Sequence, residues 1–286
     1  MIQTYSKIAG VSVVSIGIIS GLVSLLPEDP MLKAYGLYSL IITIGITIGW
    51  HAFTIIRRFI RRSGSFYADY IHNLKQHDES WCFGNKWYTK WNLVYPSKET
   101  TLAWWSNYRK GAIVIRDKYH REQGYFSIWP VQPSVFERLV QGQLTESEIT
   151  SSELQCNILK GHDYWYIADI LRAMPKKQYK GLVGNYLRLK LIYEAFRHVL
   201  DSGDFAEEFE VVAFAETTAG EAILKEYKFT HFKPKQPSRV SSKIYRRVFR
   251  KSEVKALFLE IRKGLKSREP DIHHTICLAK DKLWEA

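Results

Sequence analysis

Two long apolar stretches near the beginning of the chain limit its fold more than any other feature. Residues 8–26 and 35–56 contain almost no charged side chains, and each reaches the roughly 20 residues that a helix needs to cross a bilayer core. An acidic turn, PEDPMLKA, separates them, and four arginines follow the second stretch directly. Basic residues favour the cytoplasmic side, so the sequence predicts a two-helix transmembrane hairpin in the cell inner membrane, with both termini cytoplasmic.

Polar residues recur along the second apolar stretch at helical spacing. On a helical wheel they fall in one sector, and Gly45 and Gly49 lie on the opposite side. A simple anchor needs neither feature, because small residues and hydroxyls serve contacts between membrane helices. The hypothesis is a homo-oligomer whose second helices surround a narrow polar pore; the alternative is an inert hairpin whose hydroxyls bond their own helix. The pore candidates are Ser39, Thr43, Thr47, His51 and Thr54.

The chain is basic, with a formal net charge of +12, which favours anionic partners such as lipid head groups, nucleotides or nucleic acids. Residues 233–251 contain eight basic residues and no acidic one. Strand alternation would put Arg246 and Arg250 on one face and Tyr245, Arg247 and Phe249 on the other. The alternative is an edge strand that its charge protects from aggregation. The candidates for anion binding here are Arg239, Lys243, Arg246, Arg247 and Arg250.

The remaining sequence divides into a connecting segment and a mixed α/β region. We predict a juxtamembrane helix and an aromatic linker over 57–97, an α/β domain over 98–251, and a C-terminal helix with a tail over 252–286. Hydrophobic periodicity predicts helices at 100–108, 133–145, 184–200, 217–227 and 252–266, the last capped by Ser252. It predicts strands at 111–117, 123–131, 164–171, 208–216, 229–232 and 244–249. The three cysteines lie far apart without a C-x-x-C pair, so no metal site is predicted.

The order of these elements resembles that of the acyl-CoA N-acyltransferase (GNAT) family. The most specific stretch is VVAFAETTAGEAILKEYKF, which is similar to the family's strand, helix and short strand with an x-G-F turn. GYFSIWPV and the helix after it resemble the preceding half, and YIADI resembles the central strand. The resemblance covers a little over half of the chain. It says nothing about the membrane hairpin, but implies that the cytoplasmic part has a GNAT-like mixed sheet with flanking helices. The fold class that the sequence predicts is therefore a membrane α-helical hairpin followed by a cytoplasmic α/β domain of this kind.

The resemblance also implies a phosphate-binding loop. The family holds the pyrophosphate of CoA with Q/R-x-x-G-x-G/A at a helix N-terminus, where unpaired backbone N–H groups favour an anion. The corresponding stretch here has one extra residue before its last glycine. The alternative is that its glycines only turn the chain into the helix. If the protein is an enzyme, acetyl-CoA is the implied cosubstrate, and the candidate ligands are Lys176, Lys177, Gln178, Lys180, Gly181 and Gly184.

The catalytic groups that the resemblance implies are incomplete. Acylation of an amine needs a base for the amine proton and an acid for the leaving thiolate. Asp169 lies on the strand where the family often has its carboxylate; the alternative is a carboxylate bonded to neighbouring backbone or to a lysine. The family's usual acid is a tyrosine five residues before Phe229, where this chain has Leu224. Lys228 replaces the glycine of the motif, and Tyr227 lies three residues after the expected position.

Three functions therefore compete. The first is an oligomeric membrane effector, an ion channel gated by a nucleotide or oligonucleotide that a partner enzyme makes and that a catalytically degenerate GNAT-like domain binds. Bacterial anti-phage systems supply an analogy for it, and the missing tyrosine favours it. The alternative is a membrane-anchored N-acyltransferase that uses acyl-CoA, with Asp169 as its base. The third is an adaptor that binds anionic lipid or a protein.

Overall fold

The structure is a computed structural model of the chain, which divides into two compact units, residues 1–61 and 62–286. It describes residues 66–154, 161–175, 177–234 and 237–279, together with residues 38, 45–47, 49 and 50. The predicted membrane spans and their pore candidates lie outside the described residues, apart from these six positions; Thr47 is the one described pore candidate and is helical. Within the described ranges, no helix has both the length and the apolar character that a membrane crossing requires.

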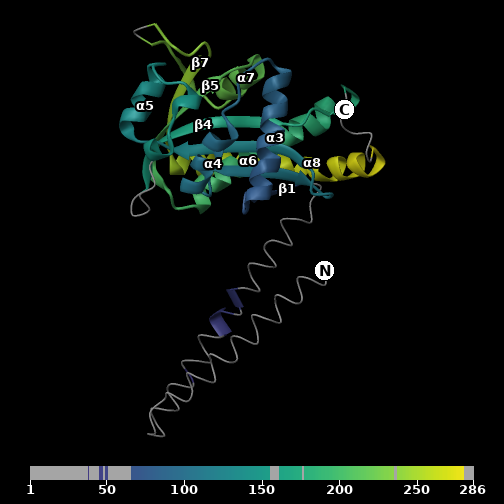
Figure 1. Ribbon diagram of the computed structural model, residues 1–286. Helices are drawn as coiled ribbons and strands as arrows, with labels where there is room; N and C mark the ends of the chain where they lie inside the picture. Colours follow the sequence, from purple (N-terminus) through teal and green to yellow (C-terminus); the bar gives the residue numbers. More distant parts are fainter. Residues whose placement is uncertain are drawn as a thin grey trace, which may run out of the picture. The chain divides into compact units, whose positions relative to one another are not determined.

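The second unit is built on a mixed sheet of seven strands in the order β1-β2-β3-β4-β5-β7-β6. Within it only β4 and β5 run parallel to each other, and helix α6 supplies the crossover that a parallel pair needs. Figure 1 shows the strands side by side. Their bounds are β1 Phe66–Tyr70, β2 Ala112–Asp117, β3 Glu122–Pro130, β4 His162–Arg172, β5 Phe205–Ala215, β6 Thr230–Phe232 and β7 Lys243–Arg250.

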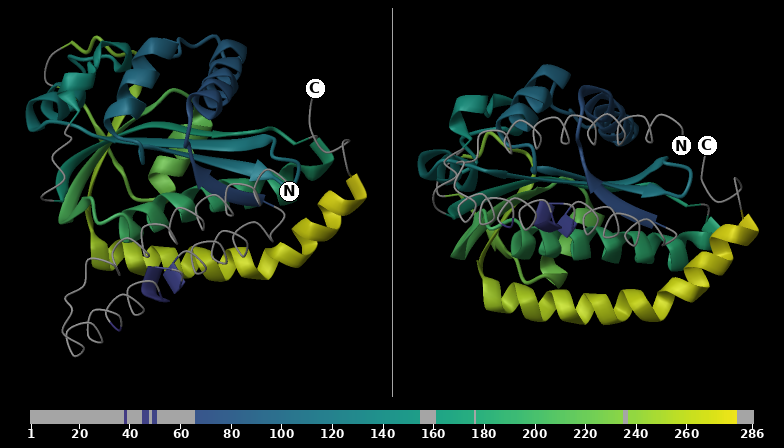
Figure 2. Two further views of the ribbon diagram at one scale, coloured as in Figure 1. Left: turned by 60° about the horizontal axis from the view of Figure 1, so that its bottom comes forward. Right: turned by 90° about the horizontal axis from the view of Figure 1, so that it is seen from below.

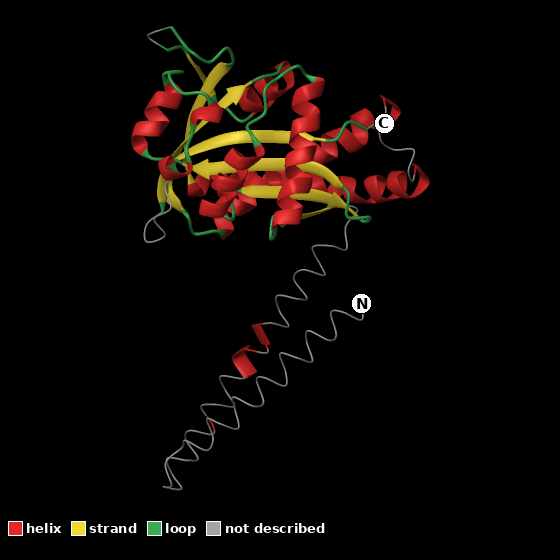
Figure 3. Cartoon of the chain, in the orientation of Figure 1, coloured by secondary structure: helices red, strands yellow, loops and turns green. Residues whose placement is uncertain are grey.

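Helices cover both faces of the sheet, as Figure 2 and the helix and strand colours of Figure 3 show. Helices α3, α4 and α5 lie on one face, while α6 and α7 lie on the other and α8 packs outside α6. Their bounds are α3 Leu74–Lys90, α4 Lys98–Asn107, α5 Pro133–Val140, α6 Asn185–Asp201, α7 Thr218–Glu226 and α8 Lys251–Ala279. The mixed α/β sheet with flanking helices that the sequence predicts is therefore confirmed.

Each face of the sheet carries its own hydrophobic core. Strand alternation explains this, because successive side chains point to opposite faces. In β3, Tyr125 and Trp129 pack with α3, α4 and α5, whereas Phe126 and Ile128 pack with α6. The central strands are thus buried on both faces, which is why β2 and β3 read as nearly continuous apolar runs.

Strands β4 and β5 separate before they end. Their pairing stops at Ile167 and Ala213, although β4 continues to Arg172 and β5 to Ala215. A register shift between β3 and β4 adds a β-bulge at Ala168, because Ser127 pairs with Asp169 but Ile128 pairs with Ile167. Bulges of this kind occur next to active sites, where they redirect a side chain. The result is an opening in the sheet beside Asp169.

The prediction of a juxtamembrane helix and linker over 57–97 is wrong for its described part. Phe66–Tyr70 is an edge strand that pairs with β2, and most of the aromatic tract is helix α3. Asn73 caps this helix, since its side chain accepts a hydrogen bond from the Gln76 N–H at 2.9 Å. Tyr88 and Trp87 of α3 are buried. This segment is therefore part of the α/β domain.

From residue 98 to 250 the predicted helices and strands are all confirmed, with small differences at their ends. The prediction that Ser252 caps the last helix is wrong, because α8 begins at Lys251, directly after β7. That helix also continues to Ala279, beyond the predicted end at 266.

Candidate functional site

A cleft with a volume of about 200 Å³ opens where β4 and β5 separate. Tyr88, Trp91 and Leu93 line it from the α3 side of the sheet. The first residues of α7, Thr218–Gly220, form part of the wall, and Thr217 caps that helix with a hydrogen bond from the Gly220 N–H at 3.1 Å. Arg172 and Arg188 line the cleft as well. The cleft thus joins aromatic, cationic and helix N-terminal groups in one place.

Asp169 lies beside this cleft on β4 and is only 5% exposed. Three hydroxyl groups donate hydrogen bonds to its carboxylate: Ser127 Oγ at 2.9 Å, Tyr88 Oη at 3.1 Å and Tyr95 Oη at 3.4 Å. Ser127 is its partner across the β3–β4 ladder, and both tyrosines come from the segment around α3. The alternative partners that the sequence suggested, neighbouring backbone or a lysine, are not those found within the described residues.

The surroundings of Asp169 shift the pKa of its carboxyl group towards neutral. Burial raises the pKa of Asp169 to about 6, although the hydrogen bonds from Ser127, Tyr88 and Tyr95 oppose this rise by stabilising the charged form. A general base is most effective when its pKa lies near the working pH. Burial, and next the charge of Asp169, raise the pKa of Tyr88 well above its usual value. Tyr88 therefore keeps its proton and connects the cleft to the carboxylate.

Two more carboxyl groups belong to this region. Glu216 lines the cleft, and Glu146 receives a hydrogen bond from Tyr166. Burial, and next the negative charges of Asp169 and Glu216, raise the pKa of Glu146 well above its usual value and so favour its neutral form. Glu146 Oε1 is buried without a hydrogen-bond partner among the described residues. A cation that enters the cleft would be attracted by the carboxylate of Glu216 in its wall.

The positive charge of the cleft comes from Arg172 at the end of β4 and Arg188 in the first turn of α6. Burial, and next the charge of Arg188, lower the pKa of Arg172. Arg188 binds Glu226 at 2.7 Å, but Arg172 pairs with no carboxylate among the described residues and contacts the sulfur of Met174 at 3.9 Å. A guanidinium without a carboxylate partner suits a phosphate group.

Gly184 makes room for this arginine. A Cβ atom at residue 184 would lie 2.9 Å from Arg172 Nη1, a distance too short for an ordinary contact. Gly184 has φ of −64°, and neither it nor Gly181 is among the glycines with positive φ. Neither glycine is therefore required by a left-handed backbone conformation, and the close approach of Arg172 explains Gly184.

The extra residue in the predicted phosphate loop is accommodated in an unusual turn. Lys180–Gly184 forms a π-helical turn that leads directly into α6. A π-turn is wider than an α-turn, and such turns are frequent at functional sites. Lys177, Gln178, Lys180 and Gly181 are exposed on this segment and do not line the cleft. Lys176 lies outside the described residues.

The five candidate residues of the basic tract all have acidic partners. The premise that their charges lack counter-ions is therefore wrong, although anion binding by these residues stays a prediction. Tyr245 and Phe249 belong to the core on the α6 side, as strand alternation predicts. The ion pairs are Arg239–Glu148 at 2.6 Å, Lys243–Glu221 at 2.8 Å, Arg246–Glu210 at 2.5 Å, Arg250–Glu208 at 2.8 Å, and Arg247–Glu253.

Tyr227 does not replace the missing acid. It is 9% exposed, packs edge-on against Phe196 with ring centroids 5.7 Å apart, and is absent from the cleft wall. Lys228 has φ of +56°, a left-handed conformation that a glycine adopts without strain. The lysine thus keeps the turn in which the family has its glycine.

Sequence reasoning missed Tyr88, Tyr95, Arg172 and Arg188. Tyr88 was hidden because the aromatic tract was interpreted as a linker. The pair Asn73 and Gln76 is a helix-start signal, an N-cap followed three residues later by glutamine, that would have marked α3. The two arginines sit at the ends of elements that the sequence predicts, but only the bend between β4 and α6 brings them together.

No protein-family model and no curated protein matches this chain. Solved structures do match it. One is a chain of the NatC complex bound to Gag peptide and CoA, with 10% identity and a TM-score of 0.42, covering 65% of this chain and 98% of that one. Another is spermidine N-acetyltransferase from Vibrio cholerae in complex with CoA and spermine, with 11% identity and a TM-score of 0.38, covering 66% and 98%.

A third similar structure is an acetyltransferase of the GNAT family from Staphylococcus aureus Mu50, with 10% identity and a TM-score of 0.38, covering 64% of this chain and 98% of that one. The class that the fold defines is an α/β domain, with a mixed sheet that contains a single parallel pair among the described strands and has helices on both faces.

Proposed function

We propose that the protein is an N-acyltransferase that moves an acyl group from acyl-CoA to an amine in the cleft between β4 and β5. The observation that carries the proposal is the buried Asp169 carboxylate, which three hydroxyl groups hold beside the cleft. Its pKa of about 6 suits a general base. This function was the alternative in the sequence analysis, and the described residues support it better than a channel.

The cationic wall of the cleft supports binding of the CoA phosphates. Arg172 and Arg188 face the cleft, and Arg172 has no carboxylate among the described residues to neutralise it. The N-terminus of α7 contributes unpaired backbone N–H groups to the same cleft. We therefore assign the phosphate-bearing end of the donor to this wall, and the thioester to the aromatic part near Tyr88.

Tyr88 and Asp169 supply a path for the amine proton. The amine nitrogen attacks the thioester carbonyl carbon, the C–S bond breaks, and the nitrogen must lose a proton. The Tyr88 hydroxyl can accept this proton while it passes its own to Asp169 Oδ1, 3.1 Å away. The thiolate then leaves as a thiol when the same path returns the proton. The carboxylate of Glu216 in the cleft wall would attract the amine as a cation before it reacts.

Membrane attachment remains part of the proposal on the strength of hydropathy alone. The two apolar stretches 8–26 and 35–56 would hold the domain at the bilayer surface. The channel hypothesis depends on residues outside the described ones and on a basic tract without counter-ions. Because the five candidate residues of this tract are paired with carboxylates, their charge no longer favours nucleotide gating.

Replacing Asp169 by Asn tests the proposal. A positioned base contributes about 10²- to 10⁴-fold, so Asp169→Asn should lower kcat/KM for acyl transfer to an amine by at least about 10²-fold. In the unaltered protein, kcat/KM should fall as the pH drops through about 6, because Asp169 then becomes protonated. Asp163→Asn is the matched control, since Asp163 lies on the same strand and is exposed. Acyl transfer is measured by thiol release.

Tyr88→Phe tests the proposed proton transfer through the Tyr88 hydroxyl while it keeps the aromatic ring in the cleft wall. It should lower kcat strongly while acyl-CoA still binds, because the ring is kept and only the hydroxyl is lost. Failure of the full-length protein to bind any acyl-CoA in equilibrium titrations would refute the proposed function. Full activity of Asp169→Asn would refute the role of this carboxylate.

A further inference from the structure

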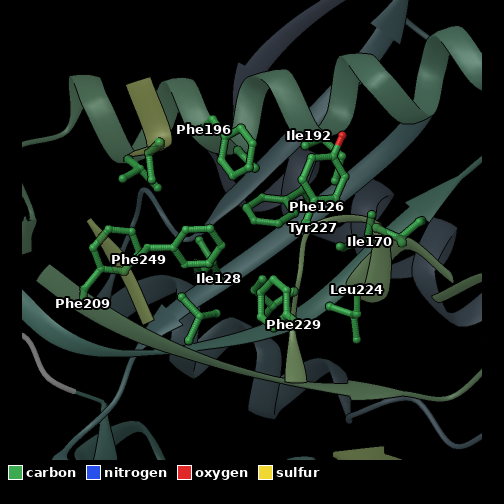
Figure 4. Close-up of a pocket in the computed structure, with 16 residues that line it drawn as sticks. Phe126, Ile128, Ile170, Ile192, Phe196, Phe209, Leu224, Tyr227, Phe229 and Phe249 are labelled. Atoms are coloured by element: carbon green, nitrogen blue, oxygen red, sulfur yellow. The ribbon is translucent and has the colours of Figure 1, made fainter. Parts of the chain in front are cut away.

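A second cavity lies on the opposite face of β4 from Asp169, under the sheet and against α6 (Figure 4). Its volume is about 50 Å³. Strands β3, β4, β5 and β7 and helices α6, α7 and α8 contribute its lining, which is apolar except for the hydroxyl of Tyr227. Figure 4 shows Phe126, Ile128, Phe196 and Phe249 around it. A dry cavity of this kind accepts apolar groups rather than water.

The cavity and the cleft have four wall residues in common: Ile167, Ile170, Ile223 and Leu224. Ile167 and Ile170 flank the bulge at Ala168, next to Asp169. The apolar cavity therefore begins where the reacting carbonyl would lie, and only side chains of β4 and α7 separate the two spaces. Native cores contain few voids larger than a water molecule, so a cavity that continues a functional cleft calls for an occupant.

We infer that this cavity receives the hydrocarbon end of the acyl group, and that the preferred donor is a thioester with a chain longer than acetyl. The inference rests on the proposed function, because it names the donor class of the same cleft. One water-sized group needs about 10–15 Å³ on this measure of volume. The cavity of about 50 Å³ thus has room for about four carbon atoms beyond the carbonyl region.

In this arrangement the two substrates contact the protein in three separate places. The phosphate end lies against Arg172 and Arg188, the amine approaches from the Tyr88 side, and the hydrocarbon chain passes between Ile170 and Leu224 to the face of α6. An acetyl group would leave the cavity empty. A chain of about five or six carbons fills it, and a longer chain must displace the aromatic side chains at its far end.

Binding of acyl-CoAs of increasing chain length to the full-length protein in detergent tests the inference. Burial of one methylene tightens binding by about fourfold. The dissociation constant, measured by titration calorimetry, should therefore fall by about fourfold per methylene from acetyl-CoA to hexanoyl-CoA. Beyond hexanoyl-CoA the gain should stop, because the cavity is full.

Ala195→Leu provides the variant, since Ala195 of α6 lines the cavity but not the cleft. The added branched side chain fills most of the space, so the ratio of hexanoyl-CoA to acetyl-CoA affinity should fall towards one. Val199→Ala enlarges the same cavity and should move the optimum towards longer chains. Ala222→Leu is the matched control on an exposed position of α7, and its chain-length profile should equal that of the unaltered protein. A cooperative thermal transition establishes that each variant is folded.

The outcomes separate this inference from the proposed function. If acetyl-CoA binds but affinity does not change with chain length, the donor inference is overturned and the proposed function stands. The donor inference is also overturned if folded Ala195→Leu keeps the original profile. If no acyl-CoA of any length binds, the proposed function itself is refuted. Two results together support both the donor inference and the proposed function. Affinity rises with chain length up to about hexanoyl-CoA in the unaltered protein, and it no longer depends on chain length in Ala195→Leu.

Discussion

At the scale of single residues, His198 shows how the domain buries a titratable group without charging it. It is 1% exposed on α6. Its Nδ1 lies 2.9 Å from the Tyr70 hydroxyl, and its Nε2 lies 3.3 Å from that of Tyr108. Burial lowers the pKa of His198 to about 3, although the charge of Asp204 opposes the shift. The folded protein therefore holds this imidazole neutral around neutral pH.

This histidine should make the domain sensitive to acid. Between about pH 6.5 and pH 3 the unfolded chain binds a proton at His198 that the folded chain does not, so the free energy of unfolding falls as the pH falls. The loss is at most about 5 kcal/mol when complete. Denaturant unfolding at several pH values measures it. His198→Gln should reduce the pH dependence over this range and His274→Gln, at an exposed site, should not; an unchanged slope in His198→Gln would contradict the account.

At the scale of secondary structure, α3 is tied to the sheet through a buried carboxylate. Ser80 of α3 donates a hydrogen bond to Glu122 of β3 at 2.7 Å, and Arg116 of β2 binds the same oxygen at 3.0 Å. The Arg116 and Glu122 side chains are 6% and 9% exposed. Burial raises the pKa of Glu122, and Ser80 and Arg116 counteract this rise. One carboxylate thus joins a helix and two strands.

Removing Arg116 should lower the free energy of unfolding far more than removing the arginine of an exposed ion pair. Arg116→Ala leaves Glu122 buried without its counter-ion, so we expect a loss of about 3–5 kcal/mol in the free energy of unfolding. Arg250→Ala removes a pair whose side chains are 74% and 55% exposed, and its loss should be under about 1 kcal/mol. Chemical denaturation compares the two variants, and equal losses would contradict the assignment of a buried pair.

The helices and strands also show which parts of the fold can be predicted from the sequence. Strands β2 to β7 carry strong alternation or continuous apolar runs, so their positions follow from local pattern. FYADY could not be recognised as β1, because five residues with an aspartate at the fourth position fit a helix or a strand equally well. Its identity depends on β2, whose edge it covers about 45 residues later in the chain. Asp169 was predicted through the family resemblance, but its tyrosine partners come from contacts between distant segments.

At the scale of the whole molecule, the α/β unit begins well before the region that resembles the GNAT family. Residues 62–286 form one compact unit, and its core includes Phe66 and Ala68 of β1 and Tyr88 of α3. A domain that starts at residue 98 would lack the strand that covers β2 and the helix that supplies the Tyr88 hydroxyl. The unit is therefore defined by packing and not by the extent of the resemblance.

Two fragments test this boundary. Fragment 62–286 should unfold in a single cooperative transition, whereas fragment 98–286 should lack one, because it exposes the β2 edge and the apolar face under α3. Circular dichroism during denaturant titration distinguishes them. A cooperative transition of similar midpoint in both fragments would show that β1 and α3 are dispensable.

The position of Trp91 has an optical consequence. Its indole forms part of the cleft wall and lies 5.9 Å from the ring of Trp87 and 6.3 Å from that of Tyr88. Indole emission depends on the polarity around the ring, and a molecule that enters the cleft replaces water there. The protein therefore carries an intrinsic fluorophore in the wall of this cleft, and entry of a molecule should change the indole emission without an attached label.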